Sequence, residues 1–226
     1  MKDKLLKSIK KKGAGIAIQQ LNRQTDVLHA LVTYDELVRD LYWQEKNLPA
    51  SITLAQAAIE HALQQSELTD NTELADDYRA KAKAISYNLA SYTWPGWNES
   101  GIVINEDEIQ IGLKAAEKNL ELAISLNRDP LGRAYAHWML GAQHIAAKDL
   151  PSAKAAFAQS AALAAEVEEK SAVLLANGFG ALVDMLSLPQ DAAAKKQYAE
   201  IKSELEQVEY GDEYIQQLHN AWKVFS

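Results

Sequence analysis

Histidines and paired carboxylates are the residues of this sequence that could do acid–base or metal chemistry. The five histidines are His29, His61, His137, His144 and His219. None has a glutamate three residues before it, which is the spacing that di-iron helical bundles use. His137 and His144 are seven residues apart and could share a helix face, but no acidic residue is spaced to complete a metal site. The carboxylate pairs Asp76-Asp77 and Glu168-Glu169 are typical of solvated helix faces.

Signatures of nucleophilic catalysis and phosphate binding are absent from the sequence. Neither Gly-x-Ser-x-Gly nor His-Glu-x-x-His occurs. Gly13-Ala14-Gly15 and Gly178-Phe179-Gly180 lack the third glycine of a phosphate-binding loop. Because the chain has no cysteine, it has no disulfide, zinc–thiolate site or thiol nucleophile. We therefore predict a protein that is not an enzyme, with no catalytic residue, cofactor or metal site.

Two of the five tryptophans lie in the unusual segment Ser91–Ser100, SYTWPGWNES. Its Pro-Gly pair favours a tight bend. Long loops inside compact helical domains are often functional, and an indole offers a large, rigid contact area. Trp94 and Trp97 are therefore candidates for a binding site. The alternative is that both indoles fill space in the core.

The elements that must position these residues are helices. Of the 226 residues, 48% are hydrophobic and 24% are charged, which fits one folded domain or a short repeat array. Apart from Gly101–Ile104, no stretch shows the alternating β-branched pattern of a strand. The fold class that we predict is all-α.

Capping residues predict where the helices begin. A capping box at Thr33–Glu36 predicts a helix that ends before Pro49, followed by a partner over Ser51–Glu67. A final helix is predicted over Glu213–Phe225, after Gly211-Asp212. The other predicted starts are Asp70–Glu73, Asn105–Glu108, Asp129-Pro130, Pro151 and Gln190.

One stretch, HWMLGAQHIAAKDLPSAKAAFAQSAALA, has a Leu140-Gly141 pair on one predicted helix and Ala153 and Phe157 on the next. This stretch resembles one unit of the tetratricopeptide repeat (TPR) family, whose helix–turn–helix repeats are about 34 residues long. Gly141 would allow close approach of the second helix, where Ala153 faces it and Phe157 fills the space one turn further on. The chain departs from the pattern at two positions. The tryptophan that is usual in the family comes one residue later here, at Trp138, and His144 stands where the family prefers Tyr.

Weaker copies of the Ala-x-x-x-Phe spacing begin at Ala55, Ala116 and Ala194. The resemblance implies an α-solenoid of about four antiparallel helix pairs over residues 16–210, with an aromatic insertion at 93–106. A C-terminal capping helix over 211–226 would cover the last apolar surface. The alternative is an ordinary alanine-rich helical bundle.

The TPR resemblance implies that the inner groove binds a protein or peptide segment. The matched unit would expose Tyr135, Trp138, Ala142 and Ile145 on the groove side. Tyr87 and Asn88 would form an aromatic rim together with Trp94 and Trp97. No Lys/Arg set is present to clamp a C-terminal carboxylate, which favours a neutral or apolar ligand. One alternative is a helical small-molecule-binding protein or enzyme whose aromatic pocket is closed by the 93–106 loop. Another is a scaffold that forms a symmetric homo-oligomer.

Charge is uneven along the chain. Residues 1–12 contain six lysines and one aspartate, whereas the whole chain has a net charge of −8. The acidic body argues against nucleic-acid binding. We expect residues 1–15 to be a basic, solvated arm, of which residues 1–12 are dispensable for folding. The alternatives are that the arm touches an anionic membrane or nucleic acid, or folds back on the acidic body. Gly13–Ile18 is too short for the apolar core of a signal peptide, and no run is long enough to span a membrane, so a cytoplasmic location is expected.

Overall fold

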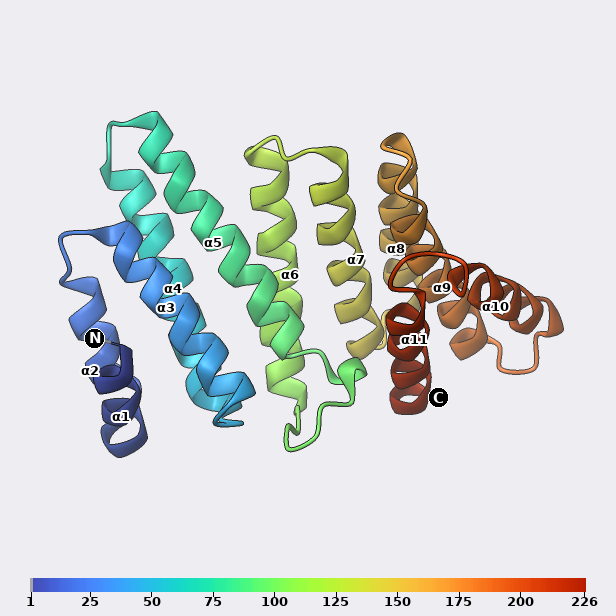
Figure 1. Cartoon of the computed structure of the whole chain (residues 1–226), viewed down its shortest axis with the longest axis horizontal. Coiled ribbons are helices and arrows are strands. Elements are labelled where there is room, and N and C mark those ends of the chain that lie inside the picture. The colour runs from blue at the N-terminus through green and yellow to red at the C-terminus, as the bar shows by residue number, and fades with distance from the viewer. Residues whose placement is uncertain (1) are drawn as a thin grey trace. The chain divides into compact units, whose positions relative to one another are not determined.

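The structure, a computed structural model, describes residues 2–226, and each regular element in that range is a helix (Figure 1). The all-α prediction is therefore confirmed. The elements in chain order are α1 (Lys2–Lys12), α2 (Gly15–Asn22), α3 (Val27–Trp43), α4 (Leu48–Leu68), α5 (Thr72–Tyr92), the short 3-10 helix η1 (Pro95–Trp97), α6 (Glu106–Ser125), α7 (Pro130–Ala146), α8 (Leu150–Glu166), α9 (Lys170–Ser187), α10 (Ala192–Leu205) and α11 (Gly211–Phe225).

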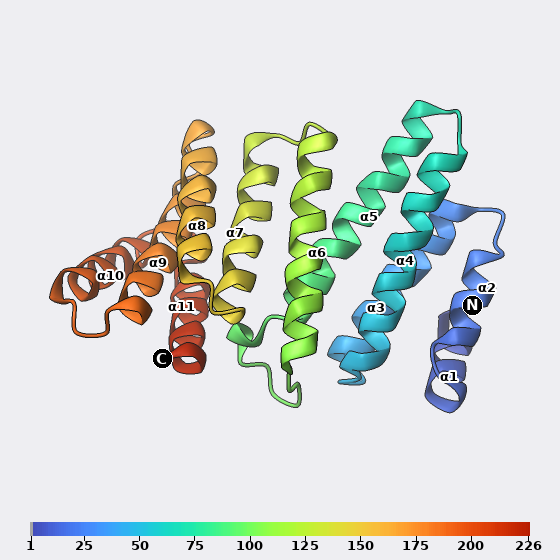
Figure 2. The ribbon, with the colours of Figure 1, turned by 180° about the vertical axis from the view of Figure 1, so that it is seen from behind.

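The chain divides into two compact units, Met1–Tyr92 and Thr93–Ser226, which we call the N-terminal and C-terminal units. In the N-terminal unit α3 packs on α4 and α4 packs on α5, and α3 also touches α5. In the C-terminal unit each of the helices α6 to α10 packs on the next, and α11 returns to contact α9 and η1 (Figure 2).

Local capping explains most of the helix starts. Asn105 and Glu108 form both hydrogen bonds of a capping box at the start of α6, as predicted. The predicted start at Asp129-Pro130 is also confirmed, because the Asp129 carboxylate accepts a hydrogen bond from the Gly132 amide. The helix predicted from Pro151 begins one residue earlier, where Asp149 accepts from the Ser152 amide at 3.2 Å.

The predicted start at Thr33–Glu36 is wrong. The helix begins at Val27, because Asp26 caps it by accepting a hydrogen bond from the His29 amide at 2.9 Å. Thr33 instead lies inside α3, where its hydroxyl donates to the His29 carbonyl at 3.0 Å. A threonine can bond back to the preceding turn, so the same residue types suit a helix interior as well as a cap.

Small residues allow close packing at two places in the C-terminal unit. A Cβ on Gly141 would lie 2.9 Å from the Phe157 ring, so α7 and α8 approach closely where the TPR-like pattern predicts it. The nearest atoms belong to Phe157 rather than to Ala153, which the pattern placed opposite the glycine. At Gly112 a Cβ would lie 2.2 Å from the Thr93 hydroxyl and 2.6 Å from the Gln143 amide nitrogen, so these buried polar side chains rest directly on α6.

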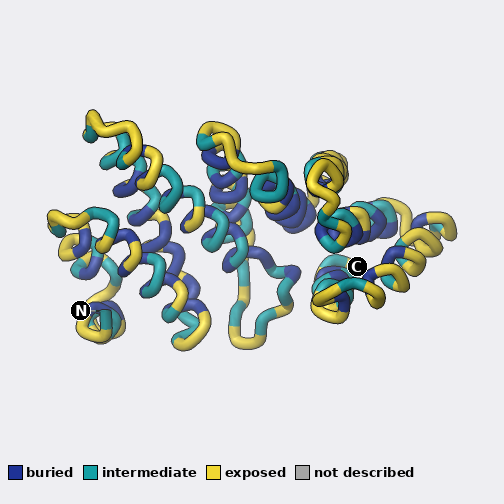
Figure 3. The backbone as a smooth tube through the Cα atoms, turned by 45° about the horizontal axis from the view of Figure 1, so that its top comes forward, coloured by how far each residue is buried: buried dark blue, intermediate teal, exposed yellow. Residues whose placement is uncertain are grey.

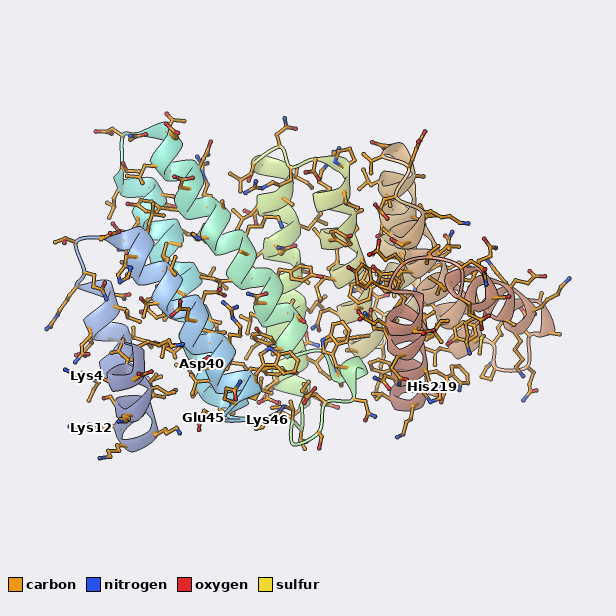
Figure 4. The ribbon with its side chains drawn as sticks, viewed as in Figure 1. Lys4, Lys12, Asp40, Glu45, Lys46 and His219 are labelled. Atoms are coloured by element: carbon orange, nitrogen blue, oxygen red, sulfur yellow. The ribbon has the colours of Figure 1, made fainter. Side chains whose placement is uncertain are left out.

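The expectation of a solvated basic arm is wrong for the described residues 2–15, while Met1 lies outside them. Residues 2–12 form α1, whose Leu5 and Ile9 are buried. Lys2 and Lys10 form ion pairs with Asp40 and Glu45 at 3.0 and 2.6 Å. Figure 4 labels these two acidic residues, and on α1 it labels Lys4 and Lys12. Leucine and isoleucine four residues apart lie on one helix face, so even a lysine-rich helix can dock through a narrow apolar stripe.

Truncating that stripe should destabilise the N-terminal unit. We expect Leu5→Ala with Ile9→Ala to lower its free energy of unfolding by about 2 kcal/mol, because two buried side chains lose their apolar contacts. Urea denaturation followed by circular dichroism measures the change. Lys4→Ala with Lys12→Ala is the matched control on the exposed face of α1 and should leave the midpoint unchanged. Equal midpoints for the two double variants would show that α1 does not contribute to the core.

Candidate functional site

Polar and aromatic side chains gather on the surface where α3 meets α5, which we call the α3–α5 face. Asp35, Arg39 and Trp43 follow one another at four-residue spacing along α3. The Asp35 carboxylate accepts hydrogen bonds from Arg39 Nη2 at 3.2 Å and from Asn88 Nδ2, on α5, at 2.9 Å. The helices thereby hold a carboxylate, a guanidinium and a carboxamide in fixed positions beside an aromatic group.

Trp43 is the exposed aromatic group of this face, with 47% of its surface accessible. Its ring meets Tyr42 edge-on at 4.8 Å between centroids, and Tyr42 stacks on Tyr92 at 4.2 Å. The Lys46 ammonium lies 5.4 Å from the centroid of the Trp43 ring. The indole is thus held in place by its neighbours although it faces solvent.

The electrostatics of the α3–α5 face centre on Tyr92. Burial raises the pKa of its hydroxyl, and the nearby Asp35 carboxylate adds to the effect. A hydrogen bond from Trp43 and the positive charge of Arg39 oppose the rise in this pKa. The hydroxyl therefore stays neutral near pH 7 and serves as a hydrogen-bonding group rather than as a base.

The side chains of this face suit binding. An indole can cover an apolar side chain, and a carboxamide has an acceptor oxygen in addition to the N–H groups that it donates. Of the predicted site residues, Tyr87 and Asn88 lie on α5, and both are half-buried. Sequence reasoning missed Trp43, Asp35 and Arg39. The one signal that could have found them is their four-residue spacing, which solvated helix faces also show.

The predicted residues of the 93–106 insertion lie in the C-terminal unit, and one of them is not accessible. Trp94 is 0% exposed. Its ring lies 4.7 Å from that of Trp97 and 5.8 Å from that of Trp138, between centroids, and it also approaches Phe179 and Phe225. Trp97 is half-buried. Trp94 is therefore part of the core, and the prediction that it contacts a ligand is wrong.

The groove residues predicted on α7 are also mostly buried. Trp138, Ala142 and Ile145 are each at most 5% exposed, whereas Tyr135 is exposed. Trp138 comes one residue later than the TPR pattern has it, which turns its side chain by about 100° around the helix. It points to Trp97, with ring centroids 6.0 Å apart. The expectation that α7 exposes these three residues to a groove is therefore wrong.

The last helix covers part of the same unit. Asn220 on α11 donates a hydrogen bond to the Trp97 carbonyl at 3.1 Å. Leu218 fills the hollow at Gly178, where a Cβ would lie 2.9 Å from its Cδ1. Burial raises the pKa of Tyr135, and the nearby Tyr214 of α11 and Glu169 raise it further. The α7 and α9 surface is thus occupied by η1 and α11 of the same chain.

Titratable groups elsewhere do not assemble into a reactive site. Within residues 2–226 no three His, Cys, Asp or Glu side chains are placed to hold a metal ion. Burial lowers the pKa of His61 and of His137, and in His137 the positive charge of Arg133 adds to the effect. His144 Nδ1 lies 3.8 Å from Asp149, which caps the next helix. No helix in the described part of the chain is long and apolar enough to cross a bilayer.

Two open clefts lie in the C-terminal unit, with volumes of about 620 and 610 Å³. The first lies among α8, α9 and α10, and the second lies between the start of α6 and the end of α7. Neither is lined by Trp94 or Trp97. The second cleft is lined by Ile104, Asn105 and Glu106 of the 93–106 insertion, but not by its tryptophans, so it is not the aromatic pocket that the sequence predicts.

Comparison with known proteins adds no assignment. No protein-family model matches the chain, and no curated protein matches it significantly.

Proposed function

We propose that this chain is a non-enzymatic binding protein built from TPR-like helix pairs, and that its α3–α5 face holds a segment of a partner protein. In the N-terminal unit the pair would be α3/α4, with α5 as the next first helix, and in the C-terminal unit the pairs would be α7/α8 and α9/α10, so that α3, α5, α7 and α9 are first helices. The contact of α3 with α5, and that of α7 with α9, supports this pairing, because first helices of successive repeats lie side by side in such arrays.

The observation that carries the proposal is the exposure of Trp43 among side chains held by hydrogen bonds. Exposing a large aromatic group on a folded surface leaves apolar area in contact with water, and such residues are enriched at the centres of interfaces. Asn88 and the Asp35–Arg39 ion pair lie further along the same face and offer hydrogen bonds there. Partner binding would bury the indole and use those groups.

The charges of the face indicate the chemistry of the ligand. Asp35 and Arg39 neutralise each other, and Lys46 is engaged over the aromatic rings. A neutral segment with one large apolar side chain fits this surface, with the apolar group on Trp43 and its backbone amides near the Asn88 carboxamide. Such a ligand agrees with the neutral or apolar one that the sequence predicts.

The packing of α11 in the C-terminal unit is an example, within this chain, of an apolar segment that lies on a first helix. There α11, an amphipathic helix with Leu218 and Ala221 buried, lies on α9 and η1. The surface of first helices thus accepts an apolar segment in this chain. In the N-terminal unit Lys2 and Lys10 of α1 form ion pairs with Asp40 and Glu45. Trp43, in contrast, stays exposed.

The alternatives predict different behaviour. The burial of Trp94 counts against a small-molecule receptor, because this tryptophan was expected to line the pocket and lies in the core instead. A homo-oligomer that buries Trp43 against a second copy would change mass with concentration. The cytoplasmic location expected from the sequence stays a prediction.

Selection of peptides on the full chain tests the proposal. Peptides from a random phage-displayed library would be selected on the wild-type protein, and their affinities measured by fluorescence anisotropy. We expect Trp43→Ala to weaken the selected peptides by at least about tenfold, because an aromatic anchor typically supplies 2 kcal/mol or more. Asn88→Ala should weaken them less, since it removes one hydrogen-bonding group.

Tyr210→Ala is the matched control, since this tyrosine is also exposed but lies in the C-terminal unit. It should leave affinity unchanged, and all three variants should remain cooperatively folded. Trp43→Ala is expected to cost about 1–3 kcal/mol in free energy of unfolding, because it removes a hydrogen bond to the buried Tyr92 hydroxyl. Peptides that bind Trp43→Ala as tightly as wild type would show that the α3–α5 face is not the binding surface. Sedimentation of the unliganded protein identifies a dimer, which would assign the face to a second copy.

A further inference from the structure

The cleft among α8, α9 and α10, with a volume of about 620 Å³, has an apolar bottom. Leu174 of α9 and Ile201 of α10 line it and are buried, and Val173 is half-buried beside them. Figure 3 shows α10 mostly in the colour of exposed residues, because only three of its side chains are buried. The cleft is therefore an open surface with apolar side chains at its base.

The edge of this cleft is acidic. Glu168, in the turn between α8 and α9, is exposed there, as are Glu200 and Glu204 of α10. Within the described chain Glu168 and Glu204 form no ion pair, and the one that Glu200 forms, with Lys196, is long at 3.6 Å. Lys170 is the one basic residue of the lining, so negative charge is in excess.

A stripe of lysines lies on α1 in the N-terminal unit. Lys4, Lys7 and Lys11 are exposed and lie on the side of α1 away from the buried Leu5 and Ile9. Within residues 2–226 none of these three lysines forms an ion pair. We call these three residues the lysine stripe.

The lysine stripe and the cleft match in spacing. Lys7 and Lys11 are four residues apart, as are Glu200 and Glu204, so each pair spans about 6 Å along its helix. The stem of a lysine is apolar although its ammonium group is charged. Two helices that pack side by side can therefore form two ion pairs while the lysine stems cover the apolar base of the cleft.

We propose that copies of the chain associate through these two surfaces, with the lysine stripe of one copy seated in the cleft among α8, α9 and α10 of another. Lys7 and Lys11 would pair with Glu200 and Glu204, and Glu168 would add negative charge beside them. Each copy has one stripe and one cleft, on different units, so the interface is heterologous and one copy can bind two others. The α3–α5 face takes no part in it.

Charge complementarity identifies a second copy as the occupant. Residues 1–12 have a net charge of +5, from six lysines and one aspartate, and residues 200–213 have a net charge of −5, from six acidic residues and one lysine. In a second copy the lysines are already on a helix that is folded against α3. Such a partner avoids the entropic cost of ordering a flexible basic segment.

Sedimentation velocity of the full chain tests the association. Wild type would be compared at about 10 μM and about 0.5 mM protein, in about 50 mM and about 500 mM salt. We expect the average mass to rise with concentration at low salt. At high salt we expect it to fall back toward the monomer, because exposed ion pairs are screened.

Two double variants remove one surface each. Lys7→Gln with Lys11→Gln, the stripe variant, and Glu200→Gln with Glu204→Gln, the cleft variant, should each raise the dissociation constant at least about tenfold. All four positions are exposed, so both variants should keep the circular dichroism and melting of wild type.

Lys114→Gln with Lys223→Gln is the matched control for the stripe variant. It makes the same change in net charge at exposed positions of α6 and α11 and should associate as wild type does. Trp43→Ala should also associate as wild type does, whereas it would abolish a dimer formed through the α3–α5 face.

Mixing the two double variants tests whether the surfaces are complementary. The stripe variant keeps its cleft, and the cleft variant keeps its lysines. Each variant alone should stay monomeric, and an equimolar mixture should form a one-to-one complex and nothing larger, since only one intact stripe and one intact cleft are present per pair.

Several results would overturn the proposal. One is a wild type that stays monomeric at low salt and about 0.5 mM protein, and another is a mixture of the two variants that forms no complex. Association that Trp43→Ala abolishes, or that neither double variant weakens, would assign it to another surface. A monomeric wild type whose cleft binds acetyl-tetralysine-amide would assign the cleft to a basic segment of a different protein.

Discussion

Replacing Trp94 with alanine is expected to lower the free energy of unfolding of the C-terminal unit by about 3–5 kcal/mol. Trp94 is fully buried, and its ring lies against those of Trp97, Trp138, Phe179 and Phe225. Its removal would leave a cavity among side chains that come from η1, α7, α9 and α11, so no single helix can move to fill it. Urea denaturation followed by circular dichroism measures this decrease in the free energy of unfolding.

Trp94→Phe separates packing from hydrogen bonding. Within the described chain the Trp94 Nε1 atom has no hydrogen-bond partner, so phenylalanine gives up volume but no polar contact. We expect it to cost about 1–2 kcal/mol, less than alanine, because part of the ring volume is kept. Trp43→Ala is the control, since that indole is exposed and in the other unit. If Trp94→Ala melted as Trp43→Ala does, Trp94 would not be a core residue.

Gly141→Leu should cost about 2–4 kcal/mol by overpacking the contact between α7 and α8. A Cβ at this position would already lie 2.9 Å from the Phe157 ring, and that ring is itself buried against Phe179 at 5.3 Å between centroids. The ring therefore has little room to move away, and the two helices must separate. The midpoint of thermal or urea unfolding measures the effect.

A matched glycine makes this prediction specific. Gly180 also lies inside a helix, but nothing is within 4 Å of the position that its Cβ would take. We expect Gly180→Ala to stabilise the protein by up to about 1 kcal/mol through helix propensity, whereas Gly141→Ala should destabilise it. Adding Phe157→Leu to Gly141→Ala should recover part of the loss. An unchanged melt for Gly141→Leu would remove the main support for the TPR-like pairing of α7 with α8.

The sequence by itself determined the helical class and several helix starts. Asn105 with Glu108, and Asp129 with Pro130, act on backbone groups no more than three residues away, so their effect does not depend on the rest of the fold. The close contact at Gly141 was also visible, because a small residue opposite a large one is a local requirement of two packed helices. In contrast, Thr33–Glu36 offered a capping box that competed with Asp26, and the earlier cap formed.

Only the tertiary structure decided which aromatic residues are accessible. From the sequence alone, the stretches that contain Trp43, Trp94 and Trp138 fit a surface as well as a core. Their exposure depends on segments far along the chain, as when Asn220 of α11 bonds to the carbonyl of Trp97, 123 residues away. The docking of α1 through Leu5 and Ile9 depended in the same way on the surface that it meets. Capping is a local interaction, but burial belongs to the whole unit, and for that reason the candidate binding surface emerged only with the fold.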